Sequence, residues 1–301
     1  MRFAAKGSSY TYEDLCADLS ELQASFNFVE VLNIGRSVQG RNLFALRIGC
    51  GPNRVHFTGG MHANEWITTP LLVKFCWQIC NALQTGVPLG GWDTRRCLGL
   101  NTVWITPAMN PDGAELVQKG ISPQHPLYTE LIKMNRGSAD FRGWKSNIRG
   151  VDLNHQFPAG WAIQSTHSPK QPYYRDHAGS GPLSEPESQA LAEFTRKQDF
   201  SLALAFHSQG QVIYWGYKGM EPPEAGTLAA EISDLSGYRA VRYAGTHAGY
   251  KDWFIQEWRR PGFTVEVGAG ANPLPLQVLP GIYTQLEKLL LRCAMGPSQG
   301  S

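Results

Sequence analysis

The sequence predicts an α/β fold in which a mixed sheet lies between layers of helices. Short apolar runs rich in β-branched and aromatic residues alternate with helical patterns along the chain. The last helical pattern places Leu286, Leu289, Leu290 and Cys293 on one face, which is the spacing of a helix that packs on a sheet. Both observations favour layered packing over an all-α or all-β fold.

Seven strands and five helices are expected from these patterns. The strands are residues 28–34, 42–48, 54–58, 101–106, 201–206, 211–214 and 262–267. The helices are residues 11–25, 67–83, 185–197, 223–236 and 276–293. Between 107 and 186 polar and turn-forming residues dominate, and we expect long loops ordered by aromatic side chains. No linker or repeat divides the chain, so residues 1–301 are predicted to form one catalytic domain.

The composition excludes several classes of protein. Hydrophobic residues make up 42% and charged residues 17% of the chain, which is typical of a folded protein rather than a disordered one. No basic cluster indicates a nucleic-acid partner. No apolar segment matches a secretory signal or a membrane span, which favours the cytoplasm, although a processed secreted form would look the same. Six cysteines are therefore expected to be reduced and mostly buried.

Four residues form a candidate zinc site, although each has an ordinary structural explanation on its own. His62 and Glu65 follow a strand and two glycines, where they would otherwise be a helix cap and a surface pair. His207 ends a buried strand, where a lone histidine is more often part of the core. Glu266 lies in an apolar strand, as a candidate general base or as an ion-pair partner of a nearby arginine. Two histidines and one carboxylate are a common ligand set for catalytic zinc.

With these four residues in this order, the sequence resembles the zinc carboxypeptidase family. Five landmarks occur in the family's order: HxxE with a following Trp from His62, NPDG at residues 110–113, GVDLN at 150–154, the strand-end His207 and the strand Glu266. The resemblance implies a mixed eight-stranded sheet with helices on both faces. It also implies one Zn²⁺ per chain, held by the two histidines and the HxxE glutamate, and attack by a zinc-activated water with Glu266 as the general base.

The family's catalytic arginine, which polarises the scissile carbonyl, has two candidate counterparts. Typical members carry it a few residues before GxDLN. Here Lys145 stands at the expected spacing and Arg149 lies nearby, and either side chain supplies a positive charge for the developing oxyanion. The sequence leaves the choice open.

Two departures from the family concern the substrate. Members that trim C-terminal residues place an arginine after DLN, which binds the terminal carboxylate together with the Asn, whereas here Asn154 is followed by His155. Asn64 stands where many digestive members carry arginine. The segments DLNHQFPAGW at residues 152–161 and HANEW at residues 62–66 most resemble the bacterial branch of the family that cleaves the γ-D-glutamyl–meso-diaminopimelate bond of peptidoglycan stem peptides.

The remaining substrate residues follow from the same resemblance. The residue before an Asp-Trp pair lies at the floor of the pocket for the departing residue, which here is Lys251. A lysine at that floor favours a negative group such as the second carboxylate of diaminopimelate, unless it is merely solvated. Tyr243 lies one residue out of register with the family's mobile tyrosine, and Tyr250 is the competing candidate.

We therefore predict a zinc peptidase that hydrolyses the γ-D-glutamyl–diamino acid bond of peptide or muropeptide substrates. The alternative is an ordinary metallocarboxypeptidase that releases acidic or other C-terminal residues. A binding module with a degenerate site is disfavoured because the three ligand candidates and the carboxylate are all present. No GxSxG or GxxxxGK motif supports a different chemistry.

Overall fold

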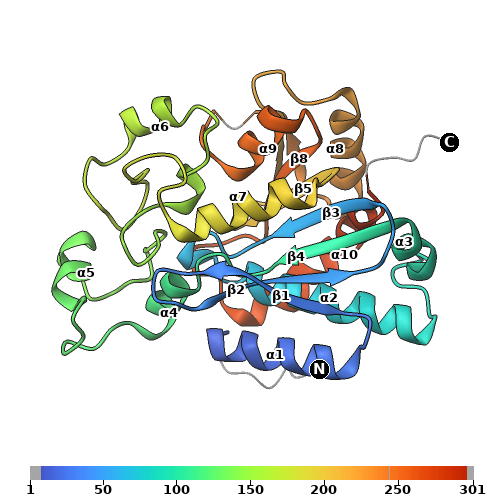
Figure 1. The fold of residues 1–301 in the computed structure, drawn as a ribbon, viewed down its shortest axis with the longest axis horizontal. Coiled ribbons are helices and arrows are strands. Elements are labelled where there is room, and N and C mark those ends of the chain that lie inside the picture. The colour runs from blue at the N-terminus through green and yellow to red at the C-terminus, as the bar shows by residue number, and fades with distance from the viewer. Residues whose placement is uncertain (1–7, 244, 297–301) are drawn as a thin grey trace.

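One eight-stranded mixed sheet organises the chain, with helices packed on both of its faces (Figure 1). The computed structural model of the protein describes residues 8–243 and 245–296. The expectation of a missing export signal concerns the N-terminus, of which residues 1–7 lie outside the described residues. The sheet and its helical layers confirm the predicted fold class.

The strands run in the order β1-β2-β4-β3-β5-β8-β6-β7 across the sheet. Their bounds are β1 Glu30–Arg36, β2 Asn42–Ile48, β3 Asn53–Thr58, β4 Asn101–Thr106, β5 Leu202–His207, β6 Val212–Trp215, β7 Arg239–Val241 and β8 Gly262–Glu266. The central strands β4, β3, β5 and β8 are parallel to one another. β2 pairs antiparallel with β1 and β4, and β6 pairs antiparallel with β8 but parallel with β7. The carboxyl ends of the four parallel strands therefore lie together.

Ten α-helices complete the described part of the chain. They are α1 Tyr12–Ser25, α2 Thr68–Thr85, α3 Thr94–Leu100, α4 Pro111–Lys119, α5 Tyr128–Met134, α6 Trp161–His167, α7 Pro186–Gln198, α8 Pro223–Ser236, α9 Tyr250–Trp258 and α10 Leu279–Ala294. Short 3₁₀ turns cover Ala63–Glu65, Leu153–His155 and Leu276–Val278. Figure 1 shows α7 on one side of the sheet, with α1 and α2 on the other.

Each face of the sheet has its own hydrophobic core. On β5, Leu202, Leu204 and Phe206 pack toward α1, α2, α8 and α10. The alternate residues Ala203 and Ala205 pack toward α7 and α9. A strand covered on both faces must be apolar at every position, which explains the continuous apolar run in the sequence. The central strands are thus held rigidly from both sides.

The predicted long elements are present, and the errors concern short ones. β2, β4 and α8 have the predicted bounds, and the other predicted strands shift by one or two residues. β7 was not predicted because three residues carry no alternation pattern. The expectation of loops between 107 and 186 was wrong where α4, α5 and α6 lie, because helices of seven to nine residues are too short to show a periodic apolar face. α3 and α9 were missed for the same reason.

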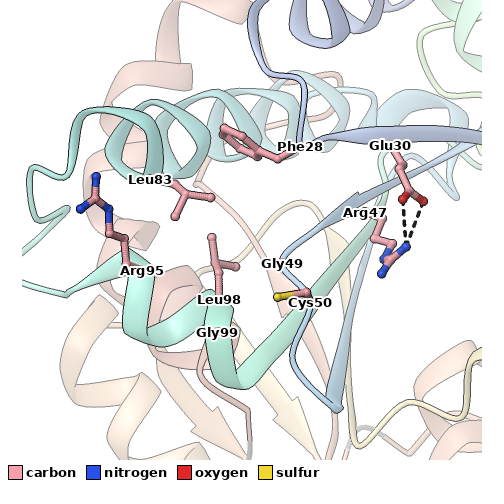
Figure 2. A pocket seen from close by; sticks show the side chains of 9 residues that line it. All are labelled: Phe28, Glu30, Arg47, Gly49, Cys50, Leu83, Arg95, Leu98 and Gly99. Carbon is pink, nitrogen blue, oxygen red and sulfur yellow. Dashed lines mark hydrogen bonds and ion pairs between the residues drawn. The ribbon is translucent and has the colours of Figure 1, made fainter.

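A cavity of about 360 Å³ lies at the end of the sheet opposite those carboxyl ends (Figure 2). Phe28, Leu83 and Leu98 form its apolar wall, while Arg95 and the Arg47–Glu30 ion pair lie at its rim. Gly49 and Cys50 come just before β3, and Gly99 comes just before β4. The cavity is therefore remote from residues that follow the parallel strands.

Two further expectations can be compared with the structure. Among the described residues, no helix is both long and apolar enough to cross a membrane. All six cysteines lie within the described ranges and are free thiols, four of them buried. The expectation that most of the cysteines are buried is confirmed.

Candidate active site

A tight turn after β3 delivers the HxxE residues to the carboxyl end of the sheet. Gly60 has a φ of +62°, and a Cβ there would lie 2.9 Å from Thr69 Oγ1 and 3.0 Å from Ala108 Cα, so the turn requires glycine. Thr68 Oγ1 accepts a hydrogen bond from the Gly60 amide at 2.8 Å. His62 follows, and the 3₁₀ turn that ends at Glu65 turns both side chains to the same side.

Asn110, the first residue of NPDG, ties this turn to a second loop. Its Oδ1 accepts from the Gly113 amide and caps α4. Its Nδ2 donates to the carbonyl oxygens of Met61 at 3.2 Å and Ser146 at 3.0 Å. The residue before His62 and the residue after Lys145 are therefore held by one amide side chain.

The three predicted metal ligands meet in one buried cluster, which we call the His–Glu–His cluster. His62 Nδ1 lies 2.9 Å from Glu65 Oε1, and His207 Nδ1 lies 3.0 Å from Glu65 Oε2. The two Nδ1 atoms are 3.1 Å apart. All three residues are buried. His207 reaches the cluster because it is the last residue of β5, parallel to β3.

The donor set of this cluster fits zinc. Ligands of a tetrahedral zinc with bonds of about 2.0–2.1 Å lie roughly 3.3 Å apart, close to the separations of these three donor atoms. Burial lowers the pKa of His62, but the carboxylates of Glu65 and Asp152 together outweigh it and raise that pKa to about 9, while burial lowers the pKa of His207. Two imidazole nitrogens and a carboxylate that converge in a buried space favour a cation between them.

Asp152, which the sequence analysis did not select, orients the first ligand. Its Oδ1 lies 3.2 Å from His62 Nε2, on the side of the ring that faces away from the cluster. A carboxylate that accepts from the outer ring nitrogen fixes the tautomer in which Nδ1 is free to bind metal. Asp152 is the aspartate of GVDLN, so the landmark itself was the available signal.

Glu266 lies beside the His–Glu–His cluster as predicted. It is the register partner of His207 across β5 and β8. Burial, and then the charge of Glu65, raise the pKa of Glu266, whereas His62 and Lys145 oppose them, and the resulting value is about 8. The carboxyl is thus placed to exchange a proton near neutral pH. The alternative, an ion pair of Glu266 with Arg259 or Arg260, is not found among the described residues, and Arg260 pairs with Asp199 at 2.7 Å.

The structure separates the two candidate cations. Lys145 Nζ lies 3.8 Å from Glu65 Oε1, and its backbone carbonyl accepts from the Ala63 amide at 3.0 Å. Burial lowers the pKa of Lys145, but the carboxylates of Glu65 and Asp152 outweigh it and the pKa is raised. The Arg149 side chain is 56% exposed and faces Glu185 at 3.5 Å. Lys145 is therefore the candidate cation that the structure places at the cluster, while the Arg149 side chain lies away from it.

Replacing Lys145 with Met should lower kcat by about 10²- to 10³-fold, the usual effect of removing one group that stabilises an oxyanion. Lys145→Arg keeps a cation and should recover part of the loss. Arg149→Met is the matched control and should leave kcat within about twofold, because exposed ion pairs contribute little. Steady-state kinetics on one peptide substrate checks all three variants. Equal losses for the two Met variants would contradict this assignment.

The DLN segment and residues 174–177 form the wall next to the cluster. Asn154 Oδ1 accepts from the Tyr250 amide at 3.2 Å, which holds its side chain in place. His155 Nδ1 lies 3.4 Å from the Asp176 carbonyl oxygen. The Asp176 amide donates to Asp152 Oδ2 at 3.3 Å, and Arg175 Nε lies 3.1 Å from Asp176 Oδ2. Sequence reasoning missed Arg175 and Asp176 because they lie in a loop with no motif.

Lys251 is buried on α9 and carries a compensated charge. Its Nζ lies 2.5 Å from Asp252 Oδ1 and donates to the Gly216 carbonyl oxygen at 2.8 Å. The alternative of a merely solvated lysine is therefore wrong. An ammonium has three N–H donors, so one remains beyond these two contacts.

The two candidate tyrosines differ in their exposure to solvent. Tyr250 is fully buried, and its hydroxyl lies 2.8 Å from His56 Nδ1 and 3.0 Å from Thr195 Oγ1 in the core under α7 and α9. The structure therefore places the Tyr250 ring in the core, away from solvent, and does not bring this candidate to the surface. Tyr243 is 49% exposed in the loop before α9, which leaves it as the candidate.

Asn64 lies between the two HxxE ligands and is itself buried. Its Oδ1 has no hydrogen-bond partner within residues 8–243 and 245–296. A buried amide oxygen without a partner is costly.

Comparisons with known proteins agree with this geometry. The family described as zinc carboxypeptidase matches residues 15–272. The "Gamma-D-glutamyl-L-diamino acid endopeptidase 1" of Lysinibacillus sphaericus is 43% identical over 283 residues, which are 94% of this chain and 72% of that protein. The fold resembles thrombin activatable fibrinolysis inhibitor (TM-score 0.76, 18% identity, 95% of this chain and 74% of that one). It also resembles carboxypeptidase A from Helicoverpa armigera (TM-score 0.69, 20% identity, 99% and 78%).

Proposed function

The chain belongs to the zinc carboxypeptidase family, and we propose that it hydrolyses the γ-D-glutamyl–diamino acid bond of cell-wall stem peptides. The observation that carries the substrate is the 43% identity, over 94% of this chain, to a protein named for that bond. Lys251 and His155 support it, since both differ from the digestive pattern and both suit a substrate with additional carboxylates. The peptidase chemistry is supported by the buried His–Glu–His cluster with Glu266 beside it.

In this proposal the ligands of one zinc ion are His62, Glu65 and His207. When bound, the zinc supplies a Lewis acid that polarises the scissile carbonyl and makes water acidic near neutral pH. Asp152 keeps the His62 ring in the tautomer with a free Nδ1.

The other residues act on protons and charge. The Glu266 carboxylate accepts a proton from the attacking water and passes it to the leaving nitrogen, so its pKa must lie near the working pH. The Lys145 ammonium donates to the oxygen on which negative charge develops. Lys251 directs its remaining N–H to the second carboxylate of a diaminopimelate residue.

A panel of tripeptides and tetrapeptides tests the proposal. Peptides with a γ-D-glutamyl–diaminopimelate bond are compared with peptides of the same composition joined through the α-carboxyl, and products are identified by mass spectrometry. We expect cleavage of the γ-linked series with release of the diamino acid side. Peptides with lysine in place of diaminopimelate should react more slowly, because lysine lacks the second carboxylate.

Trimming of the α-linked peptides without cleavage of the γ-linked series would instead identify an ordinary carboxypeptidase. Inactivity on both series by a preparation that contains zinc would contradict a peptidase altogether.

A further inference from the structure

Arg175 stands out among the charged residues around the site because no part of the reaction above uses it. It lies in the segment 174–177, between the loop of Lys145 and the DLN turn. The Tyr174 carbonyl oxygen accepts from the Lys145 amide at 2.8 Å, and the Asp152 amide donates to the His177 carbonyl oxygen at 2.8 Å. Both ends of the segment are thus fixed to elements that carry site residues.

The side chain of Arg175 is ordered but has donors to spare. Its Nε pairs with Asp176 Oδ2 at 3.1 Å, and its guanidinium carbon lies 6.0 Å from the centre of the Tyr174 ring. The side chain is 43% exposed, and its two terminal nitrogens have no recorded partner among the described residues. A guanidinium offers five N–H donors and binds a carboxylate through two of them.

Asp176 lies between the Arg175 guanidinium and His155, the residue after the DLN motif. The carboxylates of Asp176 and Asp152 and a ring nitrogen of His155 lie within 4.8 Å of one another. Arg175 is therefore close to His155, the residue that occupies the place of the family's carboxylate-binding arginine. His155 cannot replace that arginine alone, because an imidazole has no fork of parallel donors.

We propose that Arg175 is a specificity-determining residue that binds the α-carboxylate of the departing residue, together with Asn154 and His155. In this proposal Arg175, from the segment 174–177, takes the role of the arginine that follows DLN in typical family members. The inference rests on the proposed function for the identity of the departing residue, a diamino acid. It predicts that a stem peptide ending at the diamino acid is a better substrate than one that continues beyond it.

A pair of substrates tests the role of Arg175. One γ-D-glutamyl–diaminopimelate tripeptide has a free α-carboxylate on the departing residue, and the other has the isosteric α-carboxamide. The wild-type protein should prefer the free acid by about ten- to a hundredfold in kcat/KM, as expected for a charged hydrogen bond. In Arg175→Met this preference should fall below about threefold, mainly through a higher KM for the acid. Arg175→Lys should keep part of it.

Arg47→Met is the matched control. Arg47 is comparably exposed and is also paired with a carboxylate, Glu30 at 2.9 Å, but lies at the opposite end of the sheet (Figure 2). This variant should retain the full preference for the acid. A wild-type protein that cleaves both peptides equally, or an Arg175→Met variant that keeps the wild-type preference, would overturn the inference.

Failure of the proposed function would be seen separately. If only α-linked peptides are cleaved, the γ-D-glutamyl assignment is wrong, and the same acid and amide comparison is made on α-linked peptides. Arg175 is then still supported if the preference depends on it and rejected if it does not.

Discussion

Replacing Glu266 with Gln is expected to reduce kcat by about 10²- to 10⁴-fold, the contribution typical of a positioned general base. Glutamine has the size of glutamate but cannot take a proton from water or return one to the leaving nitrogen. Because Glu266 is not one of the three predicted ligands, the variant should bind as much zinc as the wild-type protein. Steady-state kinetics on a γ-linked tripeptide and metal analysis of the same preparation measure both quantities.

Glu30→Gln provides the control for this variant. Glu30 is an exposed strand glutamate at the far end of the sheet, paired with Arg47. Its replacement should leave kcat unchanged. A Glu266→Gln variant that keeps more than a tenth of the wild-type kcat with normal zinc content would show that another group accepts the proton.

Removal of the metal by a chelator should abolish hydrolysis and also lower the melting temperature. A ligand present at about 1,000 times its Kd stabilises the folded state by roughly 4 kcal/mol. For a chain of this size such a change corresponds to a shift of the order of 5–15 °C. The physical reason is that two imidazoles and a carboxylate are buried together and lose their common partner. Calorimetry with and without the chelator, followed by addition of zinc, measures the loss and its recovery.

Two histidine variants distinguish the specific site from general metal binding. His207→Ala should show little chelator-dependent shift, because it lacks one ligand of the cluster. His125→Ala should behave like the wild-type protein, since His125 lies in an exposed loop away from the cluster. An unchanged melting temperature and activity of the wild-type protein after complete zinc removal would exclude a functional metal at these residues.

The residues that the sequence predicted best are those that end strands. His207 and Glu266 lie in continuous apolar runs whose strand character is unambiguous, and parallel strands bring their carboxyl ends together. The position of each residue along its strand, together with the order of the five landmarks, was therefore enough to predict its place at the cluster. The same reasoning placed the HxxE turn, because two glycines directly follow a strand.

Residues outside strands were harder to predict because loops carry no period. Lys145 and Arg149 are four residues apart, and only the tertiary contacts of the loop turn the first toward Glu65 and the second toward Glu185. Tyr250 and Lys251 are neighbours on a short helix, yet the helical rotation buries the tyrosine in the core below. Arg175 was invisible for the same reason: its position depends on which segments its loop packs against.

The hydrogen bonds of Asn110 have a consequence for how this scaffold can vary. Because one amide joins the residue before His62, the residue after Lys145 and the start of α4, the chain between α4 and Lys145 leaves and returns at a fixed point. Much of residues 120–140 is exposed to solvent. Insertions or deletions in the exposed residues 120–130 leave this fixed point intact, whereas α5 is anchored by the buried Leu131 and Met134, and the Met134 carbonyl oxygen accepts from the Tyr174 amide at 3.3 Å. The surface formed by residues 120–130 can therefore vary in sequence and length while the catalytic residues keep their positions.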